Sequence, residues 1–362
     1  MKPMNYKTAG ESHGQGILAL VEGFPAGQEI DKLKIDAELQ RRQGGYGRGG
    51  RQNLEKDTVE ILTGIWQGKS TGAPITLWVK NRDFRIDTAP EINQPRPGHA
   101  DLAGSVKYGI PIRPILERAS ARETAGRVAA GALAKQYLAT KGITAIGFVK
   151  SIGQSRADNN ADFSPDELLR RRNASELYTV DPEQDAVIKS YIDKIGAAGD
   201  TIGGVIEVRV FGVPIGLGSH TQWDAKLDGK LAQAVMSIQA IKGVEIGLGF
   251  ESAQTPGSLM HDPIGYDPAQ EQSPNQGYVR RTNHAGGIEG GISNGQPIII
   301  RAAMKPIPTL KQPLDSIDLR TKQSMPTIYE RSDVCAVPAA SVVVENVVAF
   351  VIAAELVNTG ND

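Results

Sequence analysis

The sequence predicts an α/β protein of the α+β type, folded as one large domain over residues 1–362. Three observations support this prediction: strand-like and helical segments alternate along the chain, no Pro/Ser-rich linker divides it, and clusters of charged and small residues occur near both ends and in the middle. Clusters that build one site must fold together, which argues against independent domains. Hydrophobic residues make up 40% and charged residues 22%, as is ordinary for a soluble globular protein.

In the first part of the chain, predicted strands and a helix flank a glycine-rich loop. Residues 16–21 are expected to form a strand and residues 31–43 a short helix, and the apolar residues at 59–66 and 74–79 predict two more strands. Residues 41–52 contain the run Gly-Gly-Tyr-Gly-Arg-Gly-Gly-Arg. Because glycine is costly to order, we expect this basic loop to be mobile in the free protein and to close over bound substrate.

The clearest helix is predicted for residues 124–141. Val128, Leu133 and Tyr137 fall on one face of it, and Gly142 is a typical residue at a helix end. This apolar face indicates a helix that packs on the core.

The second half of the chain continues the alternation of helices and strands. The pairs Ser164-Pro165 and Asp181-Pro182 are favourable helix starts, so two surface helices are expected there. Residues 201–211 alternate along the chain and predict a strand. Residues 227–242 and 341–357 predict two more helices, the last of them apolar on most sides and therefore buried.

A weak internal repeat is visible in the sequence. A helix that ends at Lys141-Gly142-Ile143 leads to Ile146-Gly147, and a helix that ends at Lys242-Gly243-Val244 leads to Ile246-Gly247. These units indicate a pseudo-repeated α/β core. The alternative is that Lys-Gly is simply a common helix exit.

The net charge of −1 creates no overall field that would attract nucleic acid or a membrane. Arginines nevertheless concentrate in two stretches: Arg41, Arg42, Arg48 and Arg51, and then Arg113, Arg118, Arg122 and Arg127. Two basic patches suit a small polyanion, since guanidinium binds phosphate and carboxylate with paired hydrogen bonds. A nucleic-acid-binding loop should also carry stacking aromatics, and this one has only Tyr46. The most apolar run, 347–354, is shorter than the roughly 20 residues of a membrane-spanning helix.

Cysteine and histidine usage points to a cytoplasmic protein without a bound metal. Cys335 is the only cysteine, so an intrachain disulfide is excluded and a reducing compartment is expected. The N-terminal residues lack the apolar core of a signal peptide. The five histidines never fall at the i, i+4 spacing of a helical ligand pair.

Three clusters of ionisable and small residues are candidates for chemistry, at 10–14, 117–124 and 331–335. His13, in the first cluster, is either a turn residue or a general acid, since histidine can donate a proton near neutral pH. His99 lies in a proline-stiffened loop, which makes it a better functional candidate than a histidine on a helix surface.

Asp333 lies in the last of these clusters, before a run of small, apolar residues. Those residues would favour its protonated form and a role as a base, whereas pairing with Arg331 would favour the charged form. Both possibilities stay open from the residues alone.

Taken together, these clusters make the chain resemble the chorismate synthase family. The motifs that carry the resemblance occur in order along essentially the whole chain: Gly10-Glu11-Ser12-His13-Gly14, Arg96-Pro97-Gly98-His99-Ala100-Asp101, Glu117-Arg118-Ala119-Ser120-Ala121-Arg122-Glu123-Thr124, Asn283-His284-Ala285-Gly286-Gly287, Lys305-Pro306 and Arg331-Ser332-Asp333-Val334-Cys335. Each motif alone is weak, but six in register make chance agreement implausible.

The resemblance implies a lyase that converts 5-enolpyruvylshikimate 3-phosphate to chorismate and phosphate, the last step of the shikimate pathway to aromatic amino acids. This trans-1,4-elimination requires reduced FMN (FMNH2) without net redox change, and NADPH would be only an external source of reducing equivalents. The implied fold is a β-α-β-α sandwich, assembled as a homotetramer. The competing hypothesis is a flavin oxidoreductase, which would bind the same cofactor but transfer electrons to its substrate.

The resemblance also implies roles for individual residues. His13 would protonate the departing phosphate, His99 would neutralise charge on the reduced flavin, and Asp333 would work with the flavin N5 to remove the ring proton. The substrate's phosphate and carboxylates would be held by Arg42, Arg48 and Arg127. The flavin contacts would come from Arg118, Ala119, Ser120, Gln239, Ala240, Gly290, Lys305, Pro306, Ile307, Pro308, Thr309 and Arg331.

Overall fold

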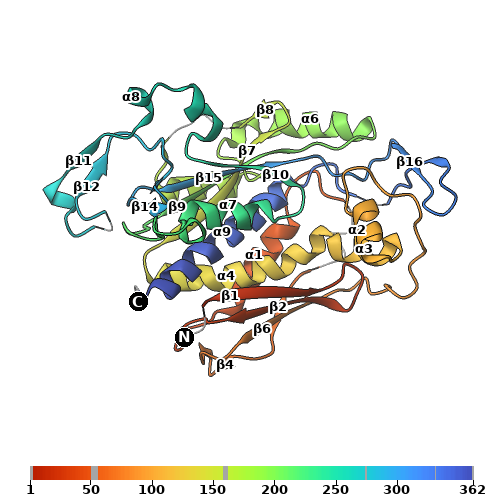
Figure 1. Cartoon of the computed structure of the whole chain (residues 1–362), viewed down its shortest axis with the longest axis horizontal. Helices are drawn as coiled ribbons and strands as arrows, with labels where there is room; N and C mark the ends of the chain where they lie inside the picture. Colours follow the sequence, from red (N-terminus) through yellow and green to blue (C-terminus); the bar gives the residue numbers. More distant parts are fainter. Residues whose placement is uncertain (1–2, 50–55, 158–161, 274, 331, 361–362) are drawn as a thin grey trace.

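The computed structural model describes residues 3–49, 56–157, 162–273, 275–330 and 332–360. Two antiparallel sheets lie on either side of a layer of helices, and further helices lie beyond the second sheet (Figure 1). The layers therefore follow the order sheet, helices, sheet, helices, which confirms the expected β-α-β-α sandwich.

The first sheet has the strand order β1 (Asn5–Gly10), β2 (Gly16–Glu22), β6 (Ile75–Lys80) and β3 (Val59–Ile61), with all neighbours antiparallel. Ile17, Ala19 and Val21 alternate along β2 and are fully buried, so one face of this sheet packs on the helices. The strand expected at 59–66 is in fact interrupted: β3 ends at Ile61, and β4 (Ile65–Trp66) pairs separately with β5 (Lys69–Ser70).

The second sheet has the order β10 (Ile241–Ile246), β15 (Ile298–Met304), β9 (Gly204–Phe211), β7 (Thr144–Ile152) and β8 (Ser155–Arg156). On β9, Ile206, Val208 and Val210 belong to the main core, as the alternation of the sequence predicts. Glu207 and Arg209 lie on the opposite face but are also buried, and they form an ion pair there with 2.7 Å between Nε and Oε1.

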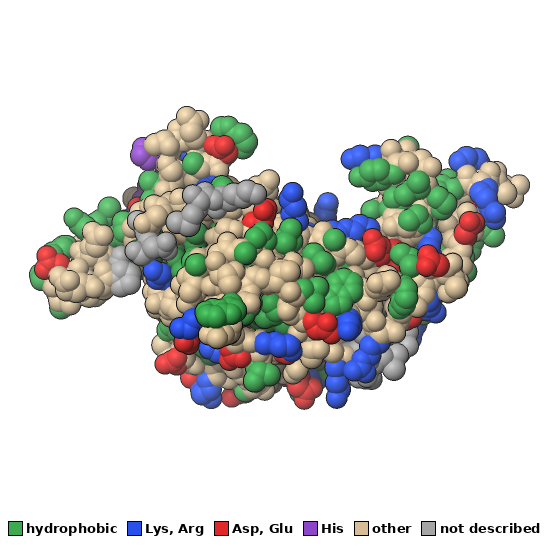
Figure 2. Space-filling model, turned by 90° about the horizontal axis from the view of Figure 1, so that it is seen from below, with side chains coloured by type: hydrophobic (Ala, Val, Ile, Leu, Met, Phe, Trp, Pro, Cys, Tyr) green, Lys and Arg blue, Asp and Glu red, His purple; other side chains and the backbone are tan. Residues whose placement is uncertain are grey.

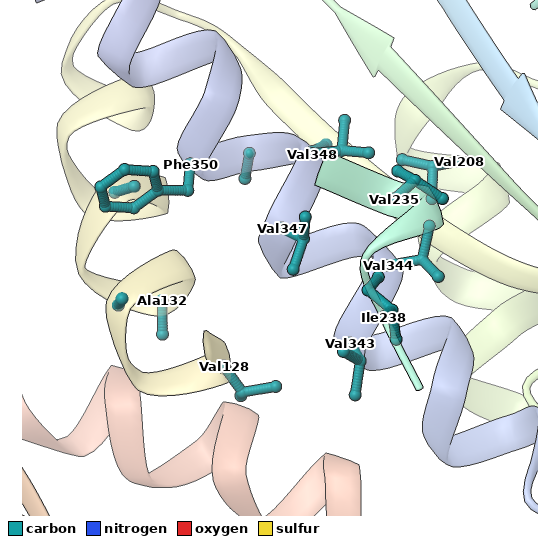
Figure 3. Close-up of a cluster of buried hydrophobic side chains, with 14 of the residues drawn as sticks. Val128, Ala132, Val208, Val235, Ile238, Val343, Val344, Val347, Val348 and Phe350 are labelled. Carbon is teal, nitrogen blue, oxygen red and sulfur yellow. The ribbon is translucent and has the colours of Figure 1, made fainter. Parts of the chain in front are cut away.

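Four helices fill the space between the sheets: α1 (Lys32–Gln43), α4 (Thr124–Thr140), α7 (Leu227–Met236) and α9 (Val337–Thr359). α4 packs on the first sheet, α9 packs on the second, and the two helices pack against each other. Figure 3 shows this contact, where valines of α9 and Phe350 meet α4 on one side and β9 and the end of α7 on the other. α9 is long and apolar enough to span a bilayer by length and composition alone, but 83% of its apolar window is buried inside the protein, as expected of a core helix.

The fourth layer begins with α5 (Pro165–Ala174), which covers the outer face of β7 through a small cluster that includes Phe148 and Leu168. α6 (Asp185–Ala197) follows on the same side (Figure 1), after a short 3-10 helix at Pro182–Gln184. The Ser164 hydroxyl accepts a hydrogen bond from the Glu167 N–H, so the predicted helix start is confirmed.

The two halves of the core repeat the same arrangement. The succession β1, β2, α1, β3, β6, α4 matches the succession β7, β9, α7, β10, β15, α9, and the paired strands have the same order in both sheets. A repeat is therefore present, but it is not the one that the sequence indicated: α4 matches α9, and α7 matches α1, so the units at 141–147 and 242–247 are not equivalent parts of it. α7 ends at Met236, and Lys242 and Gly243 lie inside β10, where Gly243 pairs with Ala303 of β15 rather than closing a helix.

The remaining elements are short. These elements are α2 (Asp101–Tyr108), α3 (Ile112–Ala119), α8 (Gly257–Met260), the hairpins β11 (Ile264–Tyr266) with β12 (Tyr278–Arg280), β13 (Ile288–Glu289) with β14 (Ile292–Ser293) and β16 (Asp315–Ile317) with β17 (Ser324–Pro326), and 3-10 helices at Ala121–Glu123, Trp223–Ala225, Gly249–Gln254 and Pro268–Gln270. α8, β11 and β12 lie at one end of the molecule, and α2, α3 and β16 lie at the other (Figure 1). Figure 2 shows two lobes that project from the body, with hydrophobic side chains exposed on both.

Candidate functional site

A cavity of about 560 Å³ collects residues from segments that are far apart in the sequence. Its wall comes from the loop after β1, the end of α1, the loop before α2, the segment between α3 and α4, the turn before β10, the segment after β15 and the segment before α9. It adjoins a larger cavity of about 1050 Å³, and the two share Arg48, Thr309 and Asp333 in their walls. The structure thus brings the three predicted clusters to one place.

His13 is fixed at one side of this cavity by Glu117 of α3. The His13 Nδ1 lies 3.0 and 2.9 Å from the two Glu117 carboxylate oxygens, and the His13 backbone N–H donates to the same carboxylate at 2.8 Å. Burial alone would raise the pKa of Glu117, but hydrogen bonds and charge from His13, with the charge of Arg113, hold this pKa below its usual value. Glu117 is therefore an ionised carboxylate beneath the ring at neutral pH.

His99 is held in the same way by Asp101, the first residue of α2. The His99 Nδ1 lies 2.5 Å from Asp101 Oδ1, and the Arg96 guanidinium binds both oxygens of that carboxylate at 2.8 and 3.1 Å. Burial opposes ionisation of Asp101, yet hydrogen bonds from His99 and Arg96 keep its pKa well below the usual range. Arg96 also donates to the Thr309 hydroxyl at 3.0 Å, which ties this loop to another part of the wall.

The basic side of the cavity is built around Asp57, which is fully buried. Arg122 binds both Asp57 oxygens at 2.7 and 2.6 Å, and the Arg42 Nη1 lies 3.5 Å from Oδ2. Arg42 also donates to the Thr124 hydroxyl at 3.0 Å. Burial lowers the pKa of Arg42 to about 10. The negative charge of Asp57 opposes this lowering, whereas the positive charges of Arg122 and Arg48 lower the pKa further. Two guanidinium groups share one carboxylate here, so the cluster keeps a positive charge next to the cavity.

Asp333 is paired with Arg48 at the boundary between the two cavities. The Arg48 Nη1 lies 3.0 Å from Asp333 Oδ2, and the Gly49 N–H donates to Oδ1 at 2.6 Å. Arg331, which the sequence offered as a partner of Asp333, lies outside the described residues. The structure therefore gives Asp333 two hydrogen-bond donors from the glycine-rich loop.

The described part of that loop is packed against the start of α9 and the segment before it, and its expected mobility and closure over substrate stay a prediction. Residues 41–43 belong to α1, and residues 50–52 lie outside the described part of the chain. Gly45 and Gly47 have φ angles of 93° and 85°, and an added Cβ would lie 2.5 Å from Pro338 and 3.0 Å from Cys335. These two glycines are therefore needed for close packing and for left-handed backbone.

Eight of the residues expected to contact a flavin line the cavity: Ala119, Ser120, Gln239, Ala240, Lys305, Ile307, Pro308 and Thr309. Ala240 adopts φ 67°, a left-handed conformation that is uncommon for alanine, and its carbonyl accepts the Lys305 backbone N–H at 2.9 Å. The Gln239 Nε2 donates to Glu123 at 3.0 Å, whereas its Oε1 is buried and has no hydrogen-bond partner among the described residues.

Of the described residues expected at the site, four lie outside the lining of this cavity: Arg118, Arg127, Pro306 and Gly290. Arg118 donates to the carbonyls of Gly10 and Thr8 at 2.9 and 3.0 Å. Arg127 binds Glu123 at 2.9 Å and the Ser237 hydroxyl at 2.7 Å. Gly290 is exposed at the turn between β13 and β14.

Several residues of the site had no predicted role. Arg122 and Glu117 are members of the second cluster, and Arg96 and Asp101 flank His99, so only their dense grouping with site residues could have indicated them. Asp57 lies in none of the motifs. In the part of the chain that the structure describes, no three His, Cys, Asp or Glu side chains form a group that could hold a metal ion.

Comparisons with known proteins identify relatives along nearly the whole chain. The sequence model of the chorismate synthase family matches residues 4–357. The chorismate synthases of Geobacter metallireducens and Aquifex aeolicus are 54% and 51% identical in sequence to this protein. The alignments cover 97% and 98% of this chain and 92% of each relative. A crystal structure of a chorismate synthase superposes with a TM-score of 0.81 at 44% identity, over 99% of this chain and 93% of that one.

Proposed function

Because the chain belongs to the chorismate synthase family, a family of lyases, we propose that it converts 5-enolpyruvylshikimate 3-phosphate to chorismate and phosphate by a trans-1,4-elimination. The observation that carries the proposal is the single cavity that brings His13, His99 and Asp333 together with buried arginines. In this account residues 1–362 form one catalytic domain, because the residues of the cavity wall run from Ser12 near one end of the chain to Ala336 near the other.

The arginine cluster supports a substrate with one phosphate and two carboxylates. Arg42 and Arg122 share the single charge of Asp57, so part of their positive charge is left for an anion in the cavity. Arg48, which pairs with Asp333 and whose charge also acts on Arg42, adds a third guanidinium group to this wall. Arg127 is assigned an indirect part, because it holds Glu123, which in turn holds Gln239 in the cavity wall.

The proton transfers are assigned to His13 and Asp333. His13 donates a proton to the departing phosphate. This proton neutralises the negative charge that develops on the phosphate oxygen as the carbon–oxygen bond breaks. Asp333 receives the proton that the substrate ring loses, so the carbon–oxygen and carbon–hydrogen bonds break with no net change in oxidation state. Glu117 holds His13 at the wall, and Arg48 with the Gly49 N–H holds Asp333 there, before substrate arrives.

The cavity also fits the reduced FMN that the family requires. Its volume lies in the range of roughly 300–1,000 Å³ that is usual for ligand sites, and Leu116, Met304 and Pro308 give it apolar walls. The unpartnered Oε1 of Gln239 is an acceptor suited to a ring N–H of a bound flavin. When bound, reduced FMN supplies electron density that assists departure of the phosphate. His99 would provide positive charge beside it, and NADPH would serve only as an external reductant.

We also propose a homotetramer in the cytoplasm. Both projecting lobes expose large hydrophobic side chains, among them Val106 (75%), Phe250 (79%) and Ile264 (67%). Patches of this kind mark protein–protein contacts more often than free surface. Sedimentation analysis of the purified protein tests the stoichiometry, and a monomer at micromolar concentration would contradict it.

Product analysis tests the proposed reaction. The protein is mixed anaerobically with 5-enolpyruvylshikimate 3-phosphate and reduced FMN, and chorismate and phosphate are measured together. Equal amounts of the two products are expected. Phosphate without chorismate, or a product that is reduced relative to the substrate, would support the competing flavin oxidoreductase or a phosphatase instead.

A further inference from the structure

The Glu117–His13 pair is built so that only one ring nitrogen remains available for proton transfer. The Glu117 side chain is fully buried, whereas 16% of the His13 side chain is exposed. Both Glu117 oxygens lie against Nδ1. The ring's other nitrogen, Nε2, lies 3.6 Å from the Asp83 carboxylate at the more exposed edge. A carboxylate at Nδ1 keeps a proton there and leaves Nε2 as the ring nitrogen that can exchange its proton.

The backbone around His13 is fixed as firmly as its ring. The His13 N–H donates to Glu117, and the His13 carbonyl accepts hydrogen bonds from the N–H groups of Arg85 and Ile86 at 3.0 Å each. The neighbouring Ser12 N–H donates to the Glu117 carbonyl, also at 3.0 Å. α3 therefore holds this loop through both the backbone and the side chain of one residue.

Arg113 links this pair to the segment that carries Asp333. Its Nη1 lies 3.6 Å from Glu117 Oε1, and its Nη2 donates to Glu330 Oε1 at 2.9 Å. Glu330 lines the same cavity, three residues before Asp333. Alternating charges thus run from His13 through Glu117 and Arg113 to Glu330.

His99 and Asp101 repeat the arrangement on another side of the cavity. Asp101 is fully buried against Nδ1, and an arginine binds the carboxylate from behind. In both pairs a buried carboxylate lies against Nδ1 of the histidine. This shared geometry argues that the carboxylate orients the histidine ring and does not only help to pack α3.

We propose that Glu117 is the positioning residue of His13: it fixes the ring with a proton on Nδ1, so that Nε2 is the atom that gives its proton to the departing group, and Arg113 keeps this pair next to the Asp333 segment. This inference rests on the proposed function. After the transfer, the ring is neutral, its remaining proton stays on Nδ1 with Glu117, and the donated proton leaves on the phosphate.

The first test needs neither substrate nor flavin. NMR of the ¹⁵N-histidine-labelled protein should show strongly deshielded Nδ1–H protons for His13 and for His99, and the signal that disappears in His13→Gln is thereby assigned to His13. Glu117→Gln should remove it or shift it to the ordinary range. The matched control is Glu207→Gln, which alters a similarly buried carboxylate on the far face of the second sheet and should leave the signal unchanged. A wild-type protein without this signal, or a signal that survives in Glu117→Gln, overturns the proposal.

Steady-state kinetics provide the second test. Glu117→Gln should lower kcat by about 100-fold or more, with KM within about threefold, because orientation of the proton donor is lost while the anion site remains. Glu117→Asp keeps the charge and should recover part of this loss, and Glu207→Gln should match the wild type. Full kcat in a folded Glu117→Gln overturns the positioning role alone. If the wild type makes no chorismate while the NMR results hold, the proposed function fails and the positioning of His13 stands.

Discussion

Asp57 is the residue whose replacement most directly tests how the basic wall of the cavity is held. Its carboxylate is fully buried and is shared by Arg122 and Arg42, whose side chains are 7% and 9% exposed. In Asp57→Asn, both guanidinium groups lose this charge while remaining buried. Removal of one partner from a buried ion pair costs about 3–5 kcal/mol. We expect the lower end, because Arg122 still donates to Asn81 and Arg42 still donates to Thr124.

This cost can be read from thermal unfolding. Unfolding entropy of about 2.1 cal/mol/K per residue gives roughly 0.8 kcal/mol/K for a chain of this length, so about 3 kcal/mol lowers Tm by roughly 4 °C. The matched control is Glu167→Gln, since Glu167 also contacts two arginines, Arg170 and Arg171, but lies at the surface. That variant should show no measurable change in Tm, because exposed ion pairs contribute little.

Inorganic phosphate adds a second, functional readout to the same variant. Since the two unpaired arginines line the cavity, millimolar phosphate should raise the Tm of Asp57→Asn by more than that of the wild type. Equal Tm losses in Asp57→Asn and Glu167→Gln, or an Asp57→Asn protein as stable as the wild type, would refute this account of the basic wall.

Three further predictions concern the histidines, acid stability and the cysteine. His13→Ala and His99→Ala should each lower kcat by roughly 100- to 10,000-fold in a folded protein, measured at saturating substrate and reduced FMN; near wild-type kcat in both would argue for purely structural histidines. The pKa values of Glu117 and Asp101 are lowered in the folded protein, so they contribute stability that is fully present above about pH 5 and is lost as the pH falls further. Urea unfolding should therefore show a falling free energy of unfolding below that pH, less steeply in Glu117→Gln. Burial raises the pKa of Cys335 to about 11, so alkylation should be slow in the folded protein at pH 8 and fast in denaturant; rapid modification without unfolding would contradict the burial.

Local sequence signals predicted the elements that depend on local chemistry. The start of α5 follows from Ser164 and Pro165, and the end of α4 follows from Gly142, because caps and glycine act within one turn of a helix. α7 ends six residues earlier than predicted. Residues 237–240 form a turn in which Ala240 has a positive φ, and β10 then pairs with β15. That pairing is a tertiary contact, which periodicity along one segment does not reveal.

The same distinction between local signals and tertiary contacts applies to the residues of the site. The motifs contained His13 and His99 and also their partners Glu117 and Asp101, but they did not show which carboxylate holds which histidine. Glu117 is 104 residues from His13, and Asp57 is 65 residues from Arg122. No spacing rule connects such pairs, because the fold alone brings them together. In the glycine-rich loop, composition indicated the glycines but not the close contacts that Gly45 and Gly47 make with Pro338 and Cys335, because those contacts also come from the fold.

The central claim is an elimination that needs reduced FMN but does not consume it. The most direct measurement is anaerobic turnover of 5-enolpyruvylshikimate 3-phosphate with a small, known amount of photoreduced FMN, in which chorismate and the flavin spectrum are followed together. The account predicts many molecules of chorismate for each flavin, with the flavin still reduced when the substrate is exhausted. One flavin oxidised for each product molecule, or equal turnover with oxidised FMN, would contradict it.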